Sequence, residues 1–149
     1  QGGTEVVFAC GGGIYTSAAE AAAKVGGKVI GVDVDQSAKI NGDYGDGMCI
    51  TSAMKGLAVT VKNVLKATCE GKWSNYAGKS ANLGLVSENP DENYVALPTD
   101  TWSLKNYTVA EYEKQLAAVI AGTLAIDDTV IAVPDYPQST ANVTITAIN

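Results

Sequence analysis

The chain has no histidine and no arginine among its 149 residues. Without histidine it can form neither a Ser-His-Asp nor a Cys-His catalytic site, and it lacks the commonest zinc ligand. Its basic residues are ten lysines against sixteen acidic residues, which gives a formal net charge of −6. This balance argues against a nucleic-acid partner, because neutralising phosphates takes clustered Lys and Arg. The composition suits a non-enzymatic protein without a metal or other cofactor.

Cysteine is also scarce, and no apolar run is long enough to span a membrane. Cys10, Cys49 and Cys69 are odd in number and far apart, so neither a disulfide framework nor a metal cluster is predicted. We expect all three to be small buried apolar side chains. No signal peptide is visible, and the chain begins without methionine just before a strand-like run. We therefore expect a processed or truncated product.

The first part of the chain contains two strand-like apolar runs with one predicted helix between them. Residues 5–9 (EVVFA) and 28–34 (KVIGVDV) are typical of buried strands. A helix is predicted over residues 17–25, where Ser17 and Glu20 have capping-box spacing. Strand, helix and strand within about 30 residues make one βαβ unit, and hence a parallel pair of strands.

Three further elements are predicted between residues 36 and 68. Residues 36–47 are polar and glycine-rich, which is typical of a loop, and residues 48–51 form a short strand. Apolar residues then recur at helical spacing, which predicts a helix over residues 53–68 with Ser52 as its cap.

The second half of the chain is less regular. Thr108 and Glu111 form another capping box and open a helix that ends near residue 121. Short strands are predicted at residues 81–86, 94–97 and 143–148, and residues 124–126 and 129–133 are short apolar runs. The expected class is α/β, a single domain with a Rossmann-like parallel sheet.

Two polar features follow predicted strands. Gly11, Gly12 and Gly13 lie between a strand and a helix, where glycines let the backbone approach a ligand. Asp33 ends the next strand, and ligands of open α/β sheets bind outside the carboxyl ends of strands. A carboxylate accepts from two adjacent hydroxyls, as a sugar diol requires. The alternative for each feature is structural: a tight turn for the glycines, and a turn cap for Asp33 or, with better fit, Asp35.

Lys55 is the third candidate ligand-binding residue. The predicted helix places it in the first turn, where a cation opposes the helix dipole. A ligand or an acidic partner would account for that position. The alternative is an exposed, solvated lysine.

Several segments together resemble the basic-membrane-protein family of ABC-transporter lipoproteins, a branch of the type I periplasmic-binding-protein fold. They are VVFACGGGIYTSAAEAA, KVIGVDVDQ, TSAMKGLAVTVKNVLK, NLGLVSENPDENYVALP and YTVAEYEKQLAAVIAG. The pairing of GVDxDQ with TSxxK about twenty residues later is the most specific part.

The resemblance implies a function and a site. Characterised members of the family bind purine nucleosides between two lobes and present them to an ABC permease. The family's glycine turn matches Gly11, Gly12 and Gly13, its ribose-binding aspartate matches Asp33, and its lysine after the TS pair matches Lys55. The chain would be the C-terminal part of such a protein, an incomplete lobe lacking the N-terminal lobe that is its partner.

On this resemblance, residues 1–149 belong mainly to the C-terminal lobe, with hinge or crossover segments near residues 52–55 and 80–100. The expected location is extracytoplasmic, as a membrane-anchored lipoprotein or a periplasmic protein. The alternative is a doubly wound nucleotide-binding or receiver-like domain with a regulatory or enzymatic role. A receiver needs several carboxylates around Mg²⁺, and the glycine turn adds none to Asp33 and Asp35.

Overall fold

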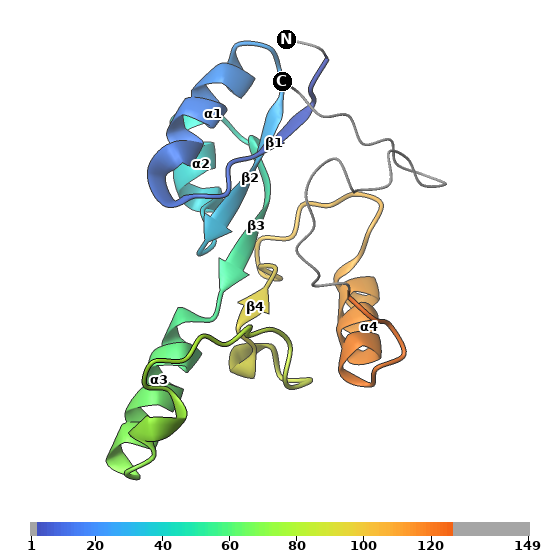
Figure 1. Cartoon of the computed structure of the whole chain (residues 1–149). Coiled ribbons are helices and arrows are strands. Elements are labelled where there is room, and N and C mark those ends of the chain that lie inside the picture. Colours follow the sequence, from blue (N-terminus) through green and yellow to red (C-terminus); the bar gives the residue numbers. More distant parts are fainter. Residues whose placement is uncertain (1–2, 127–149) are drawn as a thin grey trace, which may run out of the picture.

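A computed structural model describes residues 3–126 and shows an open sheet of four strands in the order β1-β2-β3-β4 (Figure 1). Strands β1 (Val6–Phe8), β2 (Lys28–Asp33) and β3 (Cys49–Lys55) run parallel to their neighbours. Strand β4 (Val95–Ala96) is short and pairs antiparallel with β3. The predicted α/β class with a mainly parallel sheet is confirmed.

Two helices cover one face of the parallel strands. Helices α1 (Tyr15–Ala23) and α2 (Ser37–Tyr44) lie on the same side of the sheet in Figure 1. Small alanine side chains let α1 approach β2 closely, so a compact core forms between the helices and the sheet. That core consists of Ala19, Ala22, Val29, Ile40, Met48 and Cys49.

The start of α1 differs from the predicted capping box. A short 3₁₀ turn, η1 (Gly12–Ile14), leads directly into the helix at Tyr15, and no side chain caps it. Ser17 is therefore already inside the helix. Glu20 does not reach back to a cap but accepts a hydrogen bond from Lys24 one turn later, at 2.8 Å.

Residues 36–47 are not a loop, because α2 occupies most of them. Ile40 has no exposed surface and anchors the helix to the core, Ser37 is also buried, and Tyr44 packs against the core from the end of the helix. The Asn41 Oδ1 atom accepts a hydrogen bond from the Cys49 N–H at 2.9 Å, which ties the helix to β3. One buried isoleucine and tertiary hydrogen bonds thus outweigh poor local helix propensity.

Ser52 does not cap a helix; it lies inside β3. Helix α3 (Leu57–Cys69) begins only after Gly56, so Lys55 ends a strand and is not in a first helical turn. Ser52 is fully buried, and its hydroxyl accepts a hydrogen bond from the Gln36 N–H. The Ser52 hydroxyl, which could have capped a helix, instead accepts from Gln36, a residue that precedes α2.

The chain beyond α3 adds little to the sheet. Two 3₁₀ turns, η2 (Trp73–Asn75) and η3 (Pro90–Glu92), flank a stretch in which the predicted strand at residues 81–86 is absent. Leu83 and Val86 in that stretch are exposed and pair with no strand. The predicted strand at residues 143–148 and the apolar run at 129–133 lie outside the described residues, and the run at 124–126 forms no strand.

Helix α4 (Val109–Ile120) confirms the second predicted capping box. Thr108 Oγ1 accepts from the Glu111 N–H, and the Glu111 side chain accepts from the Thr108 N–H. An aromatic cluster anchors the helix: the Trp102 ring lies 5.7 Å from Tyr107 and 5.5 Å from Tyr112, centre to centre. The Tyr112 hydroxyl also accepts from the Leu97 N–H just after β4.

Strand β1 was expected to be buried, but all three of its residues are exposed. Val6, Val7 and Phe8 keep 41%, 37% and 48% of their surface accessible. Among the described strands β1 pairs only with β2, so it forms an edge of the sheet. Cys10 and Cys69 are likewise exposed, and only Cys49 is buried as predicted.

Gly31 in β2 is a position where the fold excludes any side chain. A Cβ atom there would lie 2.5 Å from Ser52 Oγ and 3.0 Å from Gln36 Cβ. We expect Gly31→Ala to lower the free energy of unfolding by about 1–3 kcal/mol, through overpacking. Urea denaturation followed by circular dichroism measures this change.

Gly42→Ala is the matched control. Gly42 lies inside α2, and a Cβ there would meet nothing within 4 Å. Alanine should stabilise the helix by about 0.5–1 kcal/mol. If Gly31→Ala is as stable as the wild type, the close approach of β2 and β3 at this point is wrong.

Candidate functional site

The carboxyl ends of β2 and β3 bring two charged residues together. Asp33 is the last residue of β2 and lies opposite Met54, so the neighbouring Lys55 reaches it across the strands. Lys55 Nζ lies 2.6 Å from Asp33 Oδ1. These two residues, both selected from the sequence, therefore form an ion pair at the edge where ligands of parallel sheets bind.

The ion pair is half open to solvent. The Asp33 side chain keeps 31% of its surface and the Lys55 side chain 61%. Asp33 Oδ1 itself is shielded from solvent, and the Lys55 ammonium satisfies it. The close contact with this carboxylate, and its negative charge, raise the pKa of Lys55 above its ordinary value, and the Cys10 thiol nearby adds to the rise. Lys55 is thus a permanent cation at neutral pH.

Asp33 is held in a strained backbone conformation. Its φ of 70° lies in the left-handed region, and it is the only described non-glycine residue with positive φ. The Val34 N–H donates to the Val32 carbonyl at 2.8 Å, which makes Asp33 the centre of a three-residue γ-turn. Such turns with positive φ are rare and cost energy, and strain of this kind gathers at functional sites.

Two side chains hold the strained turn against the sheet. Gln36 Oε1 accepts a hydrogen bond from the Val32 N–H at 3.0 Å. The Gln36 N–H donates in turn to the buried Ser52 hydroxyl of β3 at 3.1 Å. Neither role was predicted from the sequence, where Ser52 was assigned as a helix cap, because each role depends on a partner sixteen positions away. The GVDVDQ and TS motifs are the one signal that could have linked them.

Asp35 is a structural cap, as one of the sequence-based alternatives held. Its Oδ1 atom accepts from the Ser37 N–H at 3.0 Å, at the start of α2, and its Oδ2 atom accepts from Thr101 Oγ1 at 2.7 Å. Partial burial alone would raise the pKa of Asp35. The hydrogen bonds from Ser37, Thr101 and Ser52 outweigh it, so the pKa lies below its ordinary value.

A cavity of about 360 Å³ lies beside the ion pair. It takes residues from the end of β2, the end of β3, the first turn of α3 and the segment around β4. Asn93 is its most buried polar side chain, and its amide is occupied by the backbone of Val86 and Ser87. The lining consists of Asp33, Val34, Asp35, Met54, Lys55, Gly56, Leu57, Ala58, Val59, Pro90, Asn93 and Ala96.

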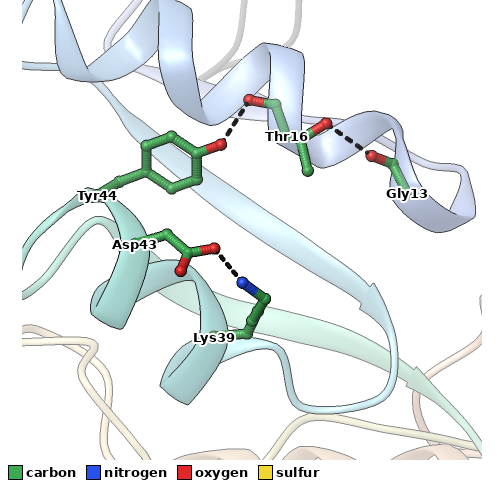
Figure 2. A network of polar contacts seen from close by, with 5 residues as sticks. All are labelled: Gly13, Thr16, Lys39, Asp43 and Tyr44. Atoms are coloured by element: carbon green, nitrogen blue, oxygen red, sulfur yellow. Dashed lines mark hydrogen bonds and ion pairs between the residues drawn. The ribbon is translucent and has the colours of Figure 1, made fainter.

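The three glycines do not line this cavity. Gly11 follows β1, and Gly12 and Gly13 begin η1, where the Gly13 carbonyl accepts a hydrogen bond from Thr16 Oγ1. Figure 2 shows this contact continuing from Thr16 to the hydroxyl of Tyr44 in α2. The glycines thus form the turn that starts α1, and α1 is fastened to α2 at that point.

A larger groove, of about 600 Å³, lies between β1 and the outer side of α1. Its charged residues include Glu20 and Lys24, which already pair with each other. No strained turn and no carboxyl end of a strand faces it. The smaller cavity beside Asp33 and Lys55 is therefore the better candidate for a binding site.

Comparison with known proteins adds no assignment. No family model matches the chain, and no curated protein and no solved structure is significantly similar to it. In residues 3–126, no group of three or more acidic or cysteine side chains is arranged to hold a metal ion. No helix in that part of the chain has the length and apolar character to cross a bilayer. The family resemblance rests on the sequence motifs and stays a prediction.

The Asp35 cap predicts a pH-dependent loss of stability. A carboxyl whose pKa is lowered in the folded state stabilises above its unfolded pKa, about 3.9, and loses that contribution as pH falls through the folded value. Asp35→Ala should cost about 1–3 kcal/mol near pH 7, because the variant loses the hydrogen bonds that the carboxylate accepts from Ser37 and Thr101. The difference in the free energy of unfolding between the wild type and Asp35→Ala should become smaller below about pH 4. Urea unfolding at several pH values measures it.

Asp43→Ala is the control, because Asp43 forms only an exposed ion pair with Lys39 one turn away. Such pairs contribute less than about 0.5 kcal/mol, so this variant should stay close to the wild type at neutral pH. An Asp35→Ala difference that does not change with pH would contradict the ionised cap.

Proposed function

We propose that this chain is a lobe of an extracytoplasmic solute-binding protein that serves an ABC importer. The proposal carries over the resemblance to the basic-membrane-protein family, whose motifs supply Asp33 and Lys55. The observation that carries it is the ion pair between these residues at the carboxyl edge of a parallel sheet, beside a cavity. A solute-sized cavity beside one carboxylate and one ammonium group suits the recognition of a polar molecule.

The chemistry of the pair favours a solute with adjacent hydroxyls, such as a nucleoside or another sugar-containing molecule. The Asp33 carboxylate has acceptor sites left over beside its contact with Lys55, and it can accept from two hydroxyls of a diol. The Lys55 ammonium has three N–H donors, of which one faces Asp33. The other N–H groups remain free for an acceptor oxygen of the solute. The two residues together can therefore form hydrogen bonds with both a donor and an acceptor group of the solute.

Strain at Asp33 supports a binding role over a purely structural one. An aspartate that only capped a turn would gain nothing from a left-handed backbone at this position, and Asp35 already supplies the cap. The Gln36 and Ser52 hydrogen bonds hold the turn in place before a ligand arrives. A carboxylate that is already fixed loses little conformational freedom on binding, which raises affinity.

The proposed cycle involves no chemical step. The solute docks on this lobe, a second lobe closes over it by a hinge, and a membrane permease recognises the closed form. Lys55 is exposed, and the cavity beside it is open to solvent. The second lobe would cover both and so complete the enclosure of the solute. The chain alone should therefore bind its solute far more weakly than the complete two-lobed protein.

Asp33→Ala should weaken solute binding by about two to four orders of magnitude. The carboxylate makes two hydrogen bonds of roughly 1.5–3 kcal/mol each in this arrangement, and 1.4 kcal/mol is about tenfold in affinity. Lys55→Ala should cost less, since water can partly replace a single flexible ammonium. NMR titration with adenosine, guanosine, inosine and free ribose measures even weak binding.

Asp43→Ala is again a suitable control, because it removes an exposed acid that lies outside the cavity lining. It should bind like the wild type. Wild-type affinity in Asp33→Ala, for whichever solute binds, would make Asp33 a turn residue and remove the proposed site.

Incubation with the same nucleosides should yield no free base and no other product above background, because the proposed function is binding alone. Chromatography of the mixture checks this.

A second experiment incubates the chain with Mg²⁺ and acetyl phosphate and looks for a phosphoryl adduct by mass spectrometry. Protein-dependent release of base, or an adduct on Asp33 or Asp35, would overturn the binding-protein proposal in favour of an enzyme or a receiver-like domain.

A further inference from the structure

Helix α3 carries an apolar stripe that the described residues leave uncovered. Leu57, Val61 and Leu65 recur every four residues, and 53%, 58% and 59% of their surfaces are exposed. The opposite face of the helix is occupied: Ala67 is buried, and Asn63 Nδ2 donates to the Tyr94 hydroxyl at 2.8 Å. Large apolar side chains in a row on an exposed helix face mark a contact surface.

Two lysines border this stripe along one side. Lys62 and Lys66 follow Val61 and Leu65 directly, so at 100° per residue both lie on the same flank of the exposed face. Helix α3 contains no acidic residue, and neither lysine forms an ion pair within residues 3–126. The flank is locally basic in a chain whose net charge is −6. Its complement is an apolar surface bordered by carboxylates.

The chain itself presents such a surface. A groove of about 290 Å³ lies between η3 and α4, with an apolar floor of Pro90, Leu116 and Ala117. Glu88 and Glu113 are the remaining residues of its lining, and both are exposed. Neither forms an ion pair within the described part of the chain. The groove thus offers to α3 what α3 lacks, both apolar contact and opposite charge.

Within one molecule the two surfaces approach each other at one end only, where Leu57 and Pro90 line the same cavity. The rest of helix α3 continues past the carboxyl end of β3, and α4 lies on the other side of β4 and η3 (Figure 1). A contact of the whole stripe with the groove therefore has to join two copies. Two α3 helices that pair antiparallel would place their lysine flanks side by side, which argues against that symmetric pairing.

We propose that the chain self-associates, with α3 of one copy seated in the Pro90–Leu116 groove of another. Leu57, Val61 and Leu65 contact the apolar floor, while Lys62 and Lys66 face Glu88 and Glu113. If each copy gives its helix and receives the other's, the result is a closed dimer; otherwise the contact repeats and builds longer chains. Leu57 and Pro90 also line the cavity beside Asp33 and Lys55, but Lys62, Lys66, Glu88 and Glu113 do not, so charge changes at these four positions test the interface separately from the solute site.

An anionic membrane is the other surface that a basic, apolar helix could contact. Lipid-binding helices usually carry cations on both sides of the apolar face and large aromatic residues within it. Here the lysines lie on one side only, and the exposed stripe has no aromatic residue. A protein groove with carboxylates on one side fits this asymmetry better.

Charge reversal tests the pairing. Sedimentation velocity over a wide concentration range should show reversible association of the wild type that weakens as salt is added. Lys62→Glu with Lys66→Glu should raise the dissociation constant by about tenfold or more, because two attractions become repulsions. Glu88→Lys with Glu113→Lys should have the same effect.

Mixing these two double variants is the decisive arm. Each is repelled by its own kind, but in the mixture every α3 meets a groove of opposite charge, so association should return to the wild-type level. Lys79→Glu with Lys105→Glu is the matched control. It changes the net charge by the same amount, involves exposed lysines outside both surfaces, and should leave association unchanged.

Three results would overturn the proposal. The wild type could be monomeric at every concentration, or the double variants could associate as it does, or the mixture could fail to recover. Vesicles of phosphatidylserine and phosphatidylcholine provide the last arm. A monomer that binds them and loses this binding in the Lys62 and Lys66 variant would assign α3 to a membrane surface. Loss of solute binding in any of these variants would not be expected, which keeps the test separate from that of the proposed function.

Discussion

The close approach of β2 and β3 at Gly31 and Ser52 is the constraint on which the carboxyl edge of the sheet depends. There is no room for a side chain at position 31, so the Ser52 hydroxyl stays buried against the β2 backbone and free to accept the Gln36 N–H. Gln36 is thereby bound to β3, and its side chain accepts from Val32 in β2. The chain between Val32 and Gln36 therefore has to reverse direction within a few residues, and Asp33 adopts the left-handed conformation that this reversal requires.

The same constraint decides where the charges lie. Because β3 continues through Ser52 to Lys55 before any helix begins, Lys55 extends from a strand end and meets Asp33 from the neighbouring strand. Had a helix begun at residue 53, the lysine would have been carried away from the sheet. Exposure of the ammonium keeps its desolvation cost low, so the pair can form without a fully buried environment. An acid and a base held together at a cavity mouth offer a polar ligand both an acceptor and a donor.

Sequence patterns predicted the parts of the fold that depend on neighbouring residues. The β-branched run of β2 and the Thr108–Glu111 capping box are local signals, and both elements lie where expected. Asp33 was also selected by the rule that ligands bind outside the carboxyl ends of strands, whereas Lys55 was selected for a helical turn in which it does not lie. Ser52 and α2 were misread for the opposite reason. A serine before an apolar run looks the same whether its hydroxyl accepts from its own helix or from Gln36. A polar segment likewise gives no sign that Ile40 will anchor it to the core. The exposure of β1 could not be predicted either, because an apolar strand has the same sequence at an edge as at the centre of a sheet.

Helix α4 is attached in a way that separates it from the rest of the molecule. Tyr112 is its one buried residue, and the Trp102 cluster with the Leu97 hydrogen bond holds that tyrosine in place. By contrast, α1, α2 and the parallel strands share a single core. Opening of the aromatic cluster would release α4 without disturbing that core, so amide protons in the helix can exchange with solvent through a local opening, whereas those of β2 and β3 wait for global unfolding. We therefore expect α4 and the core to open as separate units, with the Trp102 cluster and the Leu97 hydrogen bond as the boundary between them.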